Sequence, residues 1–277
     1  MDALTFLGLQ ATEDPNRWKL PVTEGISSGG GFLFGGAGLA AGIEALERTS
    51  GRPLVWATAQ YLSFARPPAV LDVDVKMAVT GHQVSQGRAV AHDGDDEILT
   101  VNAALGRRPL EAMGEWAVRP DVPGPDACQP RRHWRGETND ISSRLDVRVA
   151  MGRDFDQLDG TPGTGRTAMW ARLPDIDVSA AGLAVLGDFV PSGIGQALGL
   201  RAGGNSLDNT LRVARIVPTE WVLLDIRIHA VANGFGHGLV HLWAEDGTLL
   251  GTASQSAIVR FWKDGPGGRP ETKDQPT

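Results

Sequence analysis

The sequence predicts a tandem α+β fold, in which a helix and a following run of antiparallel strands occur twice along the chain. Each half contains one segment with helical spacing of apolar residues, followed by several stretches with the alternating pattern of strands. The second half repeats the order of the first, and the "AEDG" between two of its strand-like stretches is typical of a hairpin turn. Each half is therefore expected to pack one long helix on a curled antiparallel sheet.

The first half begins with a glycine-containing turn and a helix in residues 32–46, "FLFGGAGLAAGIEAL". Leu39, Ile43 and Leu46 fall at helical spacing there, and Ser50-Gly51 is a typical helix end. Strand-like stretches follow at residues 55–68, 70–79, 87–94 and 97–106.

In the second half, residues 177–190, "DVSAAGLAVLGDFV", have the helical pattern, with Leu183, Leu186 and Val190 on one side. Pro191 is expected to end this helix, because proline cannot continue the hydrogen-bond ladder. The strand-like stretches of this half are residues 143–151, 166–174, 205–219, 220–232, 238–247 and 248–262.

The repeat and the local composition together predict the domain organisation. We expect an N-terminal domain at residues 1–106, a linker rich in Pro, Gly and charge at 107–138, a C-terminal domain at 139–264 and a disordered tail at 265–277.

Composition excludes several classes of protein. The 277 residues are 42% hydrophobic and 21% charged, with a formal net charge of -7, which argues against a nucleic-acid-binding protein. No signal peptide is recognisable, and no stretch approaches the roughly 20 apolar residues needed to span a membrane. The single Cys128 cannot form an internal disulfide, so a reducing cytoplasm is the expected location.

Two polar residues stand where the strand pattern does not require them. Gln255 shares strand parity with Ala253 and Ala257, so its amide is expected to point to a buried, apolar side of the sheet. An unpartnered buried amide costs roughly 1–3 kcal/mol, which implies either a structural partner or a function. Asp208 shares parity with Thr210 and Arg212, so it is either a solvated strand residue paired with Arg212 or a functional carboxylate.

The ordered set of segments resembles the double hot-dog acyl-CoA thioesterases of the thioesterase II family. The resemblance rests on "FLFGGAGLAAGIEA", "YLSFARPP", "SLDNTLRV", "PTEWVLLD" and "DGTLLGTASQSAIVR", and it covers residues 20–262. It implies a tandem hot-dog fold, with two antiparallel sheets that each wrap a central helix. It also implies hydrolysis of acyl-CoA without a cofactor.

Members of this family use an Asp, a Gln and a hydroxyl residue to orient a water molecule against the thioester. The resemblance places Asp208 and Gln255 at the first two positions. The third position falls on His229, so the triad is Asp-His-Gln, or a hydroxyl such as Thr210 substitutes, or activity is reduced. Asn209 also departs from the family, which commonly has an aromatic residue or His there.

The remaining site residues are expected from the chemistry of a CoA thioester. Free backbone N–H groups at a helix start favour an oxyanion, and Gly35 and Gly36 occupy that place. Guanidinium groups match phosphates, so Arg66, Arg88 and Arg260 are candidates to bind CoA.

No metal site is expected, because two histidines in "HGLVH" together with His229 lack a clustered carboxylate or cysteine. Homo-oligomerisation is expected because single sheets leave edges to cover.

Two other functions stay open on the sequence alone. An enoyl-CoA hydratase on the same fold usually has a His five residues after the Asp, whereas Val213 stands at that place here. A non-catalytic acyl-CoA- or lipid-binding protein could keep the pocket without the complete triad.

Overall fold

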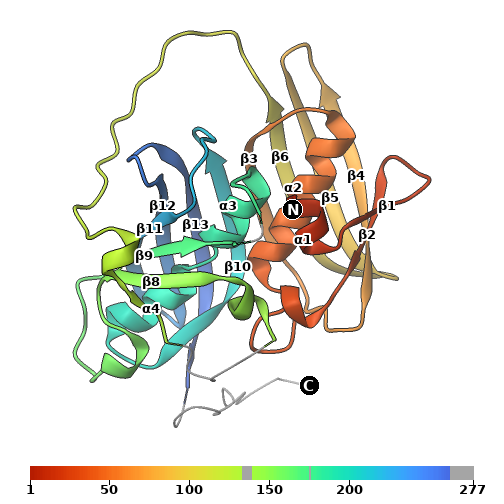
Figure 1. Ribbon diagram of the computed structural model, residues 1–277. Helices are drawn as coiled ribbons and strands as arrows, with labels where there is room; N and C mark the ends of the chain where they lie inside the picture. The colour runs from red at the N-terminus through yellow and green to blue at the C-terminus, as the bar shows by residue number, and fades with distance from the viewer. Residues whose placement is uncertain (133–138, 175, 263–277) are drawn as a thin grey trace.

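The computed structural model describes residues 1–132, 139–174 and 176–262, so the predicted tail at 265–277 lies outside the described residues. The strands form one 13-stranded sheet in the order β1-β2-β4-β5-β6-β3-β10-β13-β12-β11-β9-β8-β7 (Figure 1). In chain order the strands are β1 (Gln10–Ala11), β2 (Arg17–Pro21), β3 (Leu54–Tyr61), β4 (Val70–Thr80), β5 (Val84–Asp93), β6 (Asp96–Gly106), β7 (Gln129–Pro130), β8 (Asp146–Met151), β9 (Arg166–Arg172), β10 (Ala202–Val213), β11 (Val222–Ala232), β12 (Phe235–Ala244) and β13 (Leu249–Phe261).

Four α-helices are described: α1 (Ala3–Leu7), α2 (Gly35–Ser50), α3 (Ala180–Gly187) and α4 (Val190–Leu198). Short 3₁₀ turns lie at Glu24–Ile26, Pro125–Ala127, Ile141–Arg144 and Phe155–Gln157. None of the helices within the described residues is long and apolar enough to cross a membrane.

Within the described residues, a single strand pair carries the sheet from one half of the chain to the other. Strands β1 to β6 pair only with one another, except that β3 also pairs antiparallel with β10, from Gln60 opposite Asp208 to Trp56 opposite Arg212. The two predicted sheets are therefore joined edge to edge, and α2 lies beside α3 at this junction (Figure 1).

The predicted internal repeat is confirmed by irregularities at matching places. A bulge leaves Val55 unpaired between β3 and β6, and a second bulge leaves Leu207 unpaired between β10 and β13. Directly after β3, two consecutive backbone N–H groups donate to the carbonyl of Ile98, and directly after β10 two consecutive N–H groups donate to the carbonyl of Leu250. One module is used twice, which confirms the tandem α+β prediction.

Helix α2 needs glycine where it rests on the sheet. A Cβ at Gly38 would lie 2.6 Å from Leu99 Cδ2, and one at Gly42 would lie 2.6 Å from Val101 Cγ2. The two glycines lie one turn apart on the same side of the helix, so they let the backbone approach β6 more closely than alanine would.

The prediction that Pro191 ends a helix is wrong. The predicted helix ends earlier, at Gly187, and Pro191 lies in the first turn of α4, which begins at Val190. Proline is tolerated there because the first-turn N–H groups have no partner within the helix. Asp188 and Phe189 form the break between the two helices.

The predicted linker contributes structure to the second half. β7, within residues 107–138, pairs with β8, so ordered pairing begins before residue 139. The linker also covers the outer face of the second half, where the indole N–H of Trp170 donates to the carbonyl of Pro123 at 2.8 Å. The residues of this small second cluster are Cys128, Ala168, Trp170, Trp221, Leu223 and Trp243.

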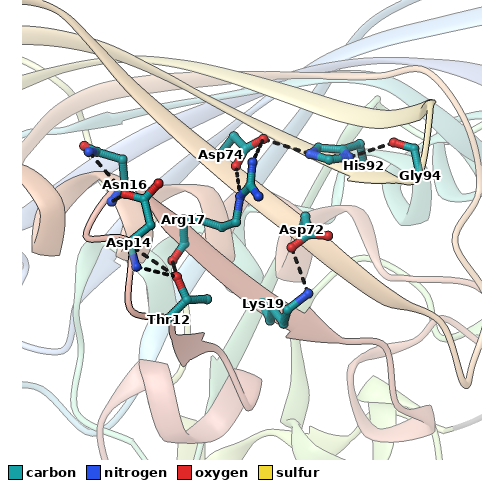
Figure 2. Close-up of polar contacts among 9 residues, drawn as sticks. All are labelled: Thr12, Asp14, Asn16, Arg17, Lys19, Asp72, Asp74, His92 and Gly94. Atoms are coloured by element: carbon teal, nitrogen blue, oxygen red, sulfur yellow. Dashed lines mark hydrogen bonds and ion pairs between the residues drawn. The ribbon is translucent and has the colours of Figure 1, made fainter.

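A charged network ties three strands of the first half together (Figure 2). Asp74 on β4 accepts from Arg17 Nε on β2 at 2.6 Å and lies 2.9 Å from Nε2 of His92 on β5. The other ring nitrogen of His92 lies 2.9 Å from the carbonyl of Gly94. Both partners are acceptors, so the network favours the protonated imidazole, and the Asp74 hydrogen bond raises the pKa of His92 above 6.5.

Replacement of His92 by Gln should lower stability in a pH-dependent way. Because the folded pKa of His92 is raised, its contribution is complete below pH 6.5 and is lost as pH rises through the folded value. The loss should not exceed about 1 kcal/mol, since this network is partly solvent-exposed. Urea unfolding at pH 5.5 and 8.5, with His82→Gln as an exposed control, measures it. A difference from wild type that grows with pH would contradict the assignment.

Candidate functional site

A buried polar cluster lies where the two halves meet. Its side chains are Asp188, from the break between α3 and α4, Ser206 on β10 and Gln255 on β13. Asp188 is 7% exposed and Gln255 is 3% exposed, as the parity of β13 predicts for the glutamine. The first turns of α2 and α4 both direct a backbone N–H group at this cluster.

Protein groups hold the amide of Gln255 on both sides. Its Oε1 accepts from the backbone N–H of Val190 at 3.1 Å. Its Nε2 donates to Ser206 Oγ at 3.1 Å and to Asp188 Oδ1. The amide nitrogen is thereby saturated, whereas a carbonyl oxygen has two lone pairs, so Oε1 can accept one more hydrogen bond.

Asp188 connects the two halves of the molecule. Its Oδ2 accepts from the backbone N–H of Gly36 at 2.6 Å, in the first turn of α2, where the helix dipole favours a negative charge. Its Oδ1 accepts from Gln255 and from Ser206 Oγ, the latter at 3.4 Å. Burial raises the pKa of Asp188, while these hydrogen bonds act in the opposite direction.

Asp188 is a member of the cluster that the strand and helix patterns did not predict. The available signal was a carboxylate inside the otherwise apolar run "LAVLGDFV", because an ionisable group in a buried segment needs partners.

Asp208 lies beside Gln255 in the sheet but does not bond to it. In the β10–β13 register Asp208 is opposite Ser256, and Asn209 is opposite Gln255. Asp208 Oδ1 accepts from the backbone N–H of Ser256 at 2.8 Å, next to the bulge at Leu207. No hydrogen bond to Oδ2 is found among the described residues, so this oxygen is available to a ligand.

Tyr61 lies at the same junction as the two carboxylates. Its hydroxyl donates to the carbonyl of Gly35 at 2.8 Å. Burial raises the pKa of Tyr61 well above 10, and the charges of Asp188 and then Asp208 raise it further. Gln60, next to Tyr61, is opposite Asp208 in the β3–β10 register, and a Cβ at Gly35 would come within 3.1 Å of the Tyr61 hydroxyl and 2.8 Å of Asp188 Oδ2. Asp208 and the Asp188–Gln255 cluster therefore lie at the same junction.

The structure does not place His229 in this cluster. It is exposed, at the bulge of β11, and the whole of β12 separates it from β13. The residue that lines up with Gln255 across Gly238 is the apolar Ile228. The bulge moves His229 out of the position that counting along the strand predicted.

Thr210 does not take the place of His229 in the cluster. Its hydroxyl pairs with that of Thr58 at 2.7 Å. Strand alternation puts both Thr210 and Asp208 on the face opposite to Asn209 and Gln255, but only Asp208 adjoins the bulge, where its carboxylate turns to the backbone N–H of Ser256.

The two glycines predicted to bind an oxyanion lie at the cluster. A Cβ at Gly35 would come within 2.8 Å of Asp188 Oδ2, and one at Gly36 within 2.8 Å of the carbonyl of Ala184. Only glycine fits this approach, but the N–H group of Gly36 already donates to Asp188.

The three predicted phosphate-binding arginines lie apart from one another. Arg66 is exposed near the start of α2, where its Nη1 donates to the carbonyl of Gly31 at 3.1 Å. Arg260 lies near the end of β13, opposite Gly203. Arg88 lies on β5 in a different cavity, with His92, so the structure separates it from the cluster.

A large cavity also lies elsewhere. It has a volume of about 1000 Å³ and lies beside the segment that follows β9 and the connection from β10 to β11. Its lining includes Leu173, Ile176, Val178, Ile216 and Glu220 but no member of the polar cluster. Within the described ranges, no group of three or more His, Cys, Asp or Glu side chains is arranged to hold a metal ion.

Comparison with known proteins identifies the family. Residues 125–259 match the family model of the acyl-CoA thioesterase C-terminal domain. A crystal structure of a protein described as a thioesterase, from Novosphingobium aromaticivorans, is 32% identical over 90% of this chain and 97% of that one, with a TM-score of 0.80. The chain belongs to the acyl-CoA thioesterase family. It is a thioesterase, an enzyme that hydrolyses thioesters.

More distant structures confirm the hot-dog fold of this thioesterase. A hot-dog protein from Alicyclobacillus acidocaldarius is 17% identical, with a TM-score of 0.82 over 94% of this chain and 98% of that one. A structure described as thioesterase II from Thermobifida fusca is also 17% identical, with a TM-score of 0.77 over 93% and 97% of the two chains. No curated protein sequence matches the chain significantly.

Asp188→Asn should destabilise the thioesterase by roughly 1–3 kcal/mol. An Asn side chain turns an amide nitrogen toward either Gly36 N–H or Gln255 Nε2, so two donors face each other in a buried place. Urea unfolding measures the loss, with Asp177→Asn, at an exposed position, as the matched control. Equal stability of the two variants would show that Asp188 does not hold the junction.

Proposed function

We propose that the protein hydrolyses acyl-CoA to the free acid and CoA, with a water molecule oriented by Gln255 and deprotonated by Asp208. The observation that supports this best is the geometry of the Gln255 amide. It is buried and fixed at the first turn of α4, it retains one unused acceptor site on Oε1, and it lies one register position from a carboxylate with a free oxygen.

The reaction needs only these groups and water. The water donates one hydrogen bond to Gln255 Oε1 and its other proton to Asp208 Oδ2 as its oxygen bonds to the thioester carbonyl carbon. The carbon–sulfur bond then breaks, and the proton held by Asp208 passes to the thiolate of CoA. Fixed amides and carboxylates place the water without reorganisation during the reaction.

Asp188 acts as a positioning residue in this scheme. Its carboxylate oxygens accept from Gly36, Gln255 and Ser206, and the residue is only 7% exposed. The amide nitrogen of Gln255 must point to the Asp188 carboxylate, because only the nitrogen can donate to it. The amide oxygen therefore faces Val190. The acceptor oxygen is thereby directed to the water.

The acyl-CoA is proposed to enter at the open end of the β3–β10 junction. Leu62, Phe64 and Leu207 are 49%, 56% and 38% exposed. The first two follow Tyr61 along the chain, and Leu207 follows Ser206, a member of the buried cluster. The rings of Phe32 and Phe64 lie 4.8 Å apart, and the Arg66 guanidinium lies 6.0 Å from the Phe32 ring. An apolar rim with a cation beside it suits a thioester whose acyl chain is apolar and whose CoA is anionic.

Asp208→Asn and Gln255→Leu should each lower the rate of thiol release from acyl-CoA by about a hundredfold or more, because one loses the base and the other the water acceptor. Release of free CoA thiol with short, medium and long acyl-CoAs measures it. His229→Ala, on the exposed bulge, should retain wild-type turnover. A hundredfold lower rate of thiol release in His229→Ala, with a wild-type rate in Asp208→Asn, would reverse the assignment.

The same assay tests the competing functions. Enoyl-CoA is followed by loss of its absorbance, and acyl-CoA binding by calorimetry. Loss of enoyl absorbance without thiol release would indicate a hydratase. Tight binding of acyl-CoA with neither reaction would indicate a binding protein, and both results would overturn the hydrolytic proposal.

We also propose that the protein forms a homo-oligomer in a cytoplasmic setting. The part of the linker at residues 107–124 has no regular structure and exposes a row of apolar side chains. Leu110, Met113, Trp116 and Val118 are 67%, 80%, 88% and 77% exposed. Such a row is costly to leave in water, and a second copy of this chain would cover it.

Trp116→Ser should therefore shift the protein toward the monomer in light scattering coupled to size-exclusion chromatography. Aromatic residues contribute a large share of interface energy, so one substitution should raise the dissociation constant by tenfold or more. Glu111→Ser, in the same exposed segment, is the control and should leave the mass unchanged. A wild-type mass equal to one chain at micromolar concentration would disprove the oligomer.

A further inference from the structure

We infer that Asn209 is a catalytic residue whose side-chain N–H group donates to the carbonyl oxygen of the thioester and stabilises the oxyanion that develops there. This role rests on the proposed hydrolysis, in which the developing oxyanion requires a hydrogen-bond donor.

The position of Asn209 places its amide at the cluster. Asn209 is the direct partner of Gln255 in the β10–β13 register, so both side chains lie on the same face of the sheet. It is also the partner of Ala59 on β3, so it lies at the junction of the halves. Its amide is near enough to the Tyr61 hydroxyl to lower the pKa of that group, although it makes no well-formed hydrogen bond with it.

The amide of Asn209 is buried and unpartnered. Asn209 is 1% exposed, and neither Nδ2 nor Oδ1 has a hydrogen-bond partner among the described residues. A buried amide in this state costs roughly 1–3 kcal/mol of stability. Every other side chain of the cluster is hydrogen-bonded, so the unmet bonds of Asn209 point to a ligand or a water molecule.

Several other donors near the cluster are already engaged. The N–H group of Gly36 donates to Asp188, the N–H group of Val190 donates to Gln255, and both amide hydrogens of Gln255 are used. The Tyr61 hydroxyl donates to the carbonyl of Gly35. An oxyanion formed here needs a donor that does not first break one of these bonds, and Asn209 Nδ2 offers two hydrogens.

The internal repeat supplies a comparison within the same chain. Ala57 stands two residues after the bulge at Val55, as Asn209 stands two residues after the bulge at Leu207. Ala57 is fully buried and apolar, so the fold itself does not require an amide at this place. The amide occurs only in the half that also carries Gln255.

In the reaction, the water oxygen bonds to the carbonyl carbon while the carbonyl electron pair moves onto oxygen, which accepts from Asn209 Nδ2. When the carbonyl re-forms, the carbon–sulfur bond breaks and the thiolate takes the proton from Asp208. The hydrogen bond of Asn209 strengthens as the oxygen becomes negative, so it acts mainly on kcat.

Asn209→Leu and Asn209→Ala test this in the full-length protein. Leu has the same branching as Asn but no donor, and Ala covers the case in which the larger Leu does not fit. Each variant should lower kcat by about 10²–10³-fold with little change in KM, the usual effect of removing one such donor. Thermal unfolding of Asn209→Leu should occur at the wild-type temperature or above it, because an unpaired buried amide has been removed.

Thr210→Val, next in sequence and on the opposite face, is the control and should keep wild-type kcat. A trifluoromethyl ketone analogue of acyl-CoA, which takes up water to form a tetrahedral oxyanion, gives a second readout. Its inhibition constant should rise by the factor by which kcat/KM falls, while the affinity for an unreactive thioether analogue stays constant.

Each outcome decides the inference. An unchanged kcat, or a lower melting temperature with normal turnover per folded molecule, would show that Asn209 is structural, and the proposed hydrolysis would stand. Equal weakening of both analogues would show ground-state binding rather than oxyanion stabilisation. A wild-type protein inert toward every acyl-CoA would overturn the proposed function and this inference with it.

Discussion

The pairing of β3 with β10 is the constraint on which the rest of the structure depends. Among the described strands it is the only pair that joins the two halves, and it brings the first turn of α2 beside the break between α3 and α4. Asp188 can then accept from Gly36, a residue of the other half, at 2.6 Å. The hydrogen bonds of Gln255 follow from that contact, because its amide nitrogen turns to the same carboxylate.

The duplicated fold is symmetric in backbone and asymmetric in chemistry. Both halves have a bulge at matching places and a helix that covers the sheet. The buried positions that correspond to Asn209 and Gln255 are Ala57 and Ala103 in the first half. One half of a duplicated module can therefore stay apolar and support the fold, while the other half carries the polar groups. The free-energy cost of burying polar groups then arises in only one half.

The sequence predicts what depends on periodicity, and it fails where one residue breaks the period. The repeat, the helix at Gly35–Ser50 and the burial of Gln255 all follow from regular spacing. His229 was misplaced because a bulge shifts the register of β11 by one residue, and nothing in the local sequence marks it. Asp188 was missed because its partners lie far along the chain, at Gly36 and Gln255.

The contrast between Gln255 and Asn209 suggests how the cluster divides its work. Gln255 is bonded to Val190, Ser206 and Asp188, so its orientation is fixed and only one lone pair of its oxygen is left for a ligand. Asn209, its neighbour across the strands, has no partner for either amide atom in the described part of the chain, in an equally buried place. A folded chain tolerates an unpaired buried amide only if other interactions compensate for it, and the corresponding position of the first half carries alanine, so the module itself does not require an amide there. The unpaired amide costs folding free energy in the resting protein, and this cost is offset when the amide donates to an oxygen that is becoming negative. Because that hydrogen bond is strongest in the transition state, it stabilises the transition state more than the bound substrate.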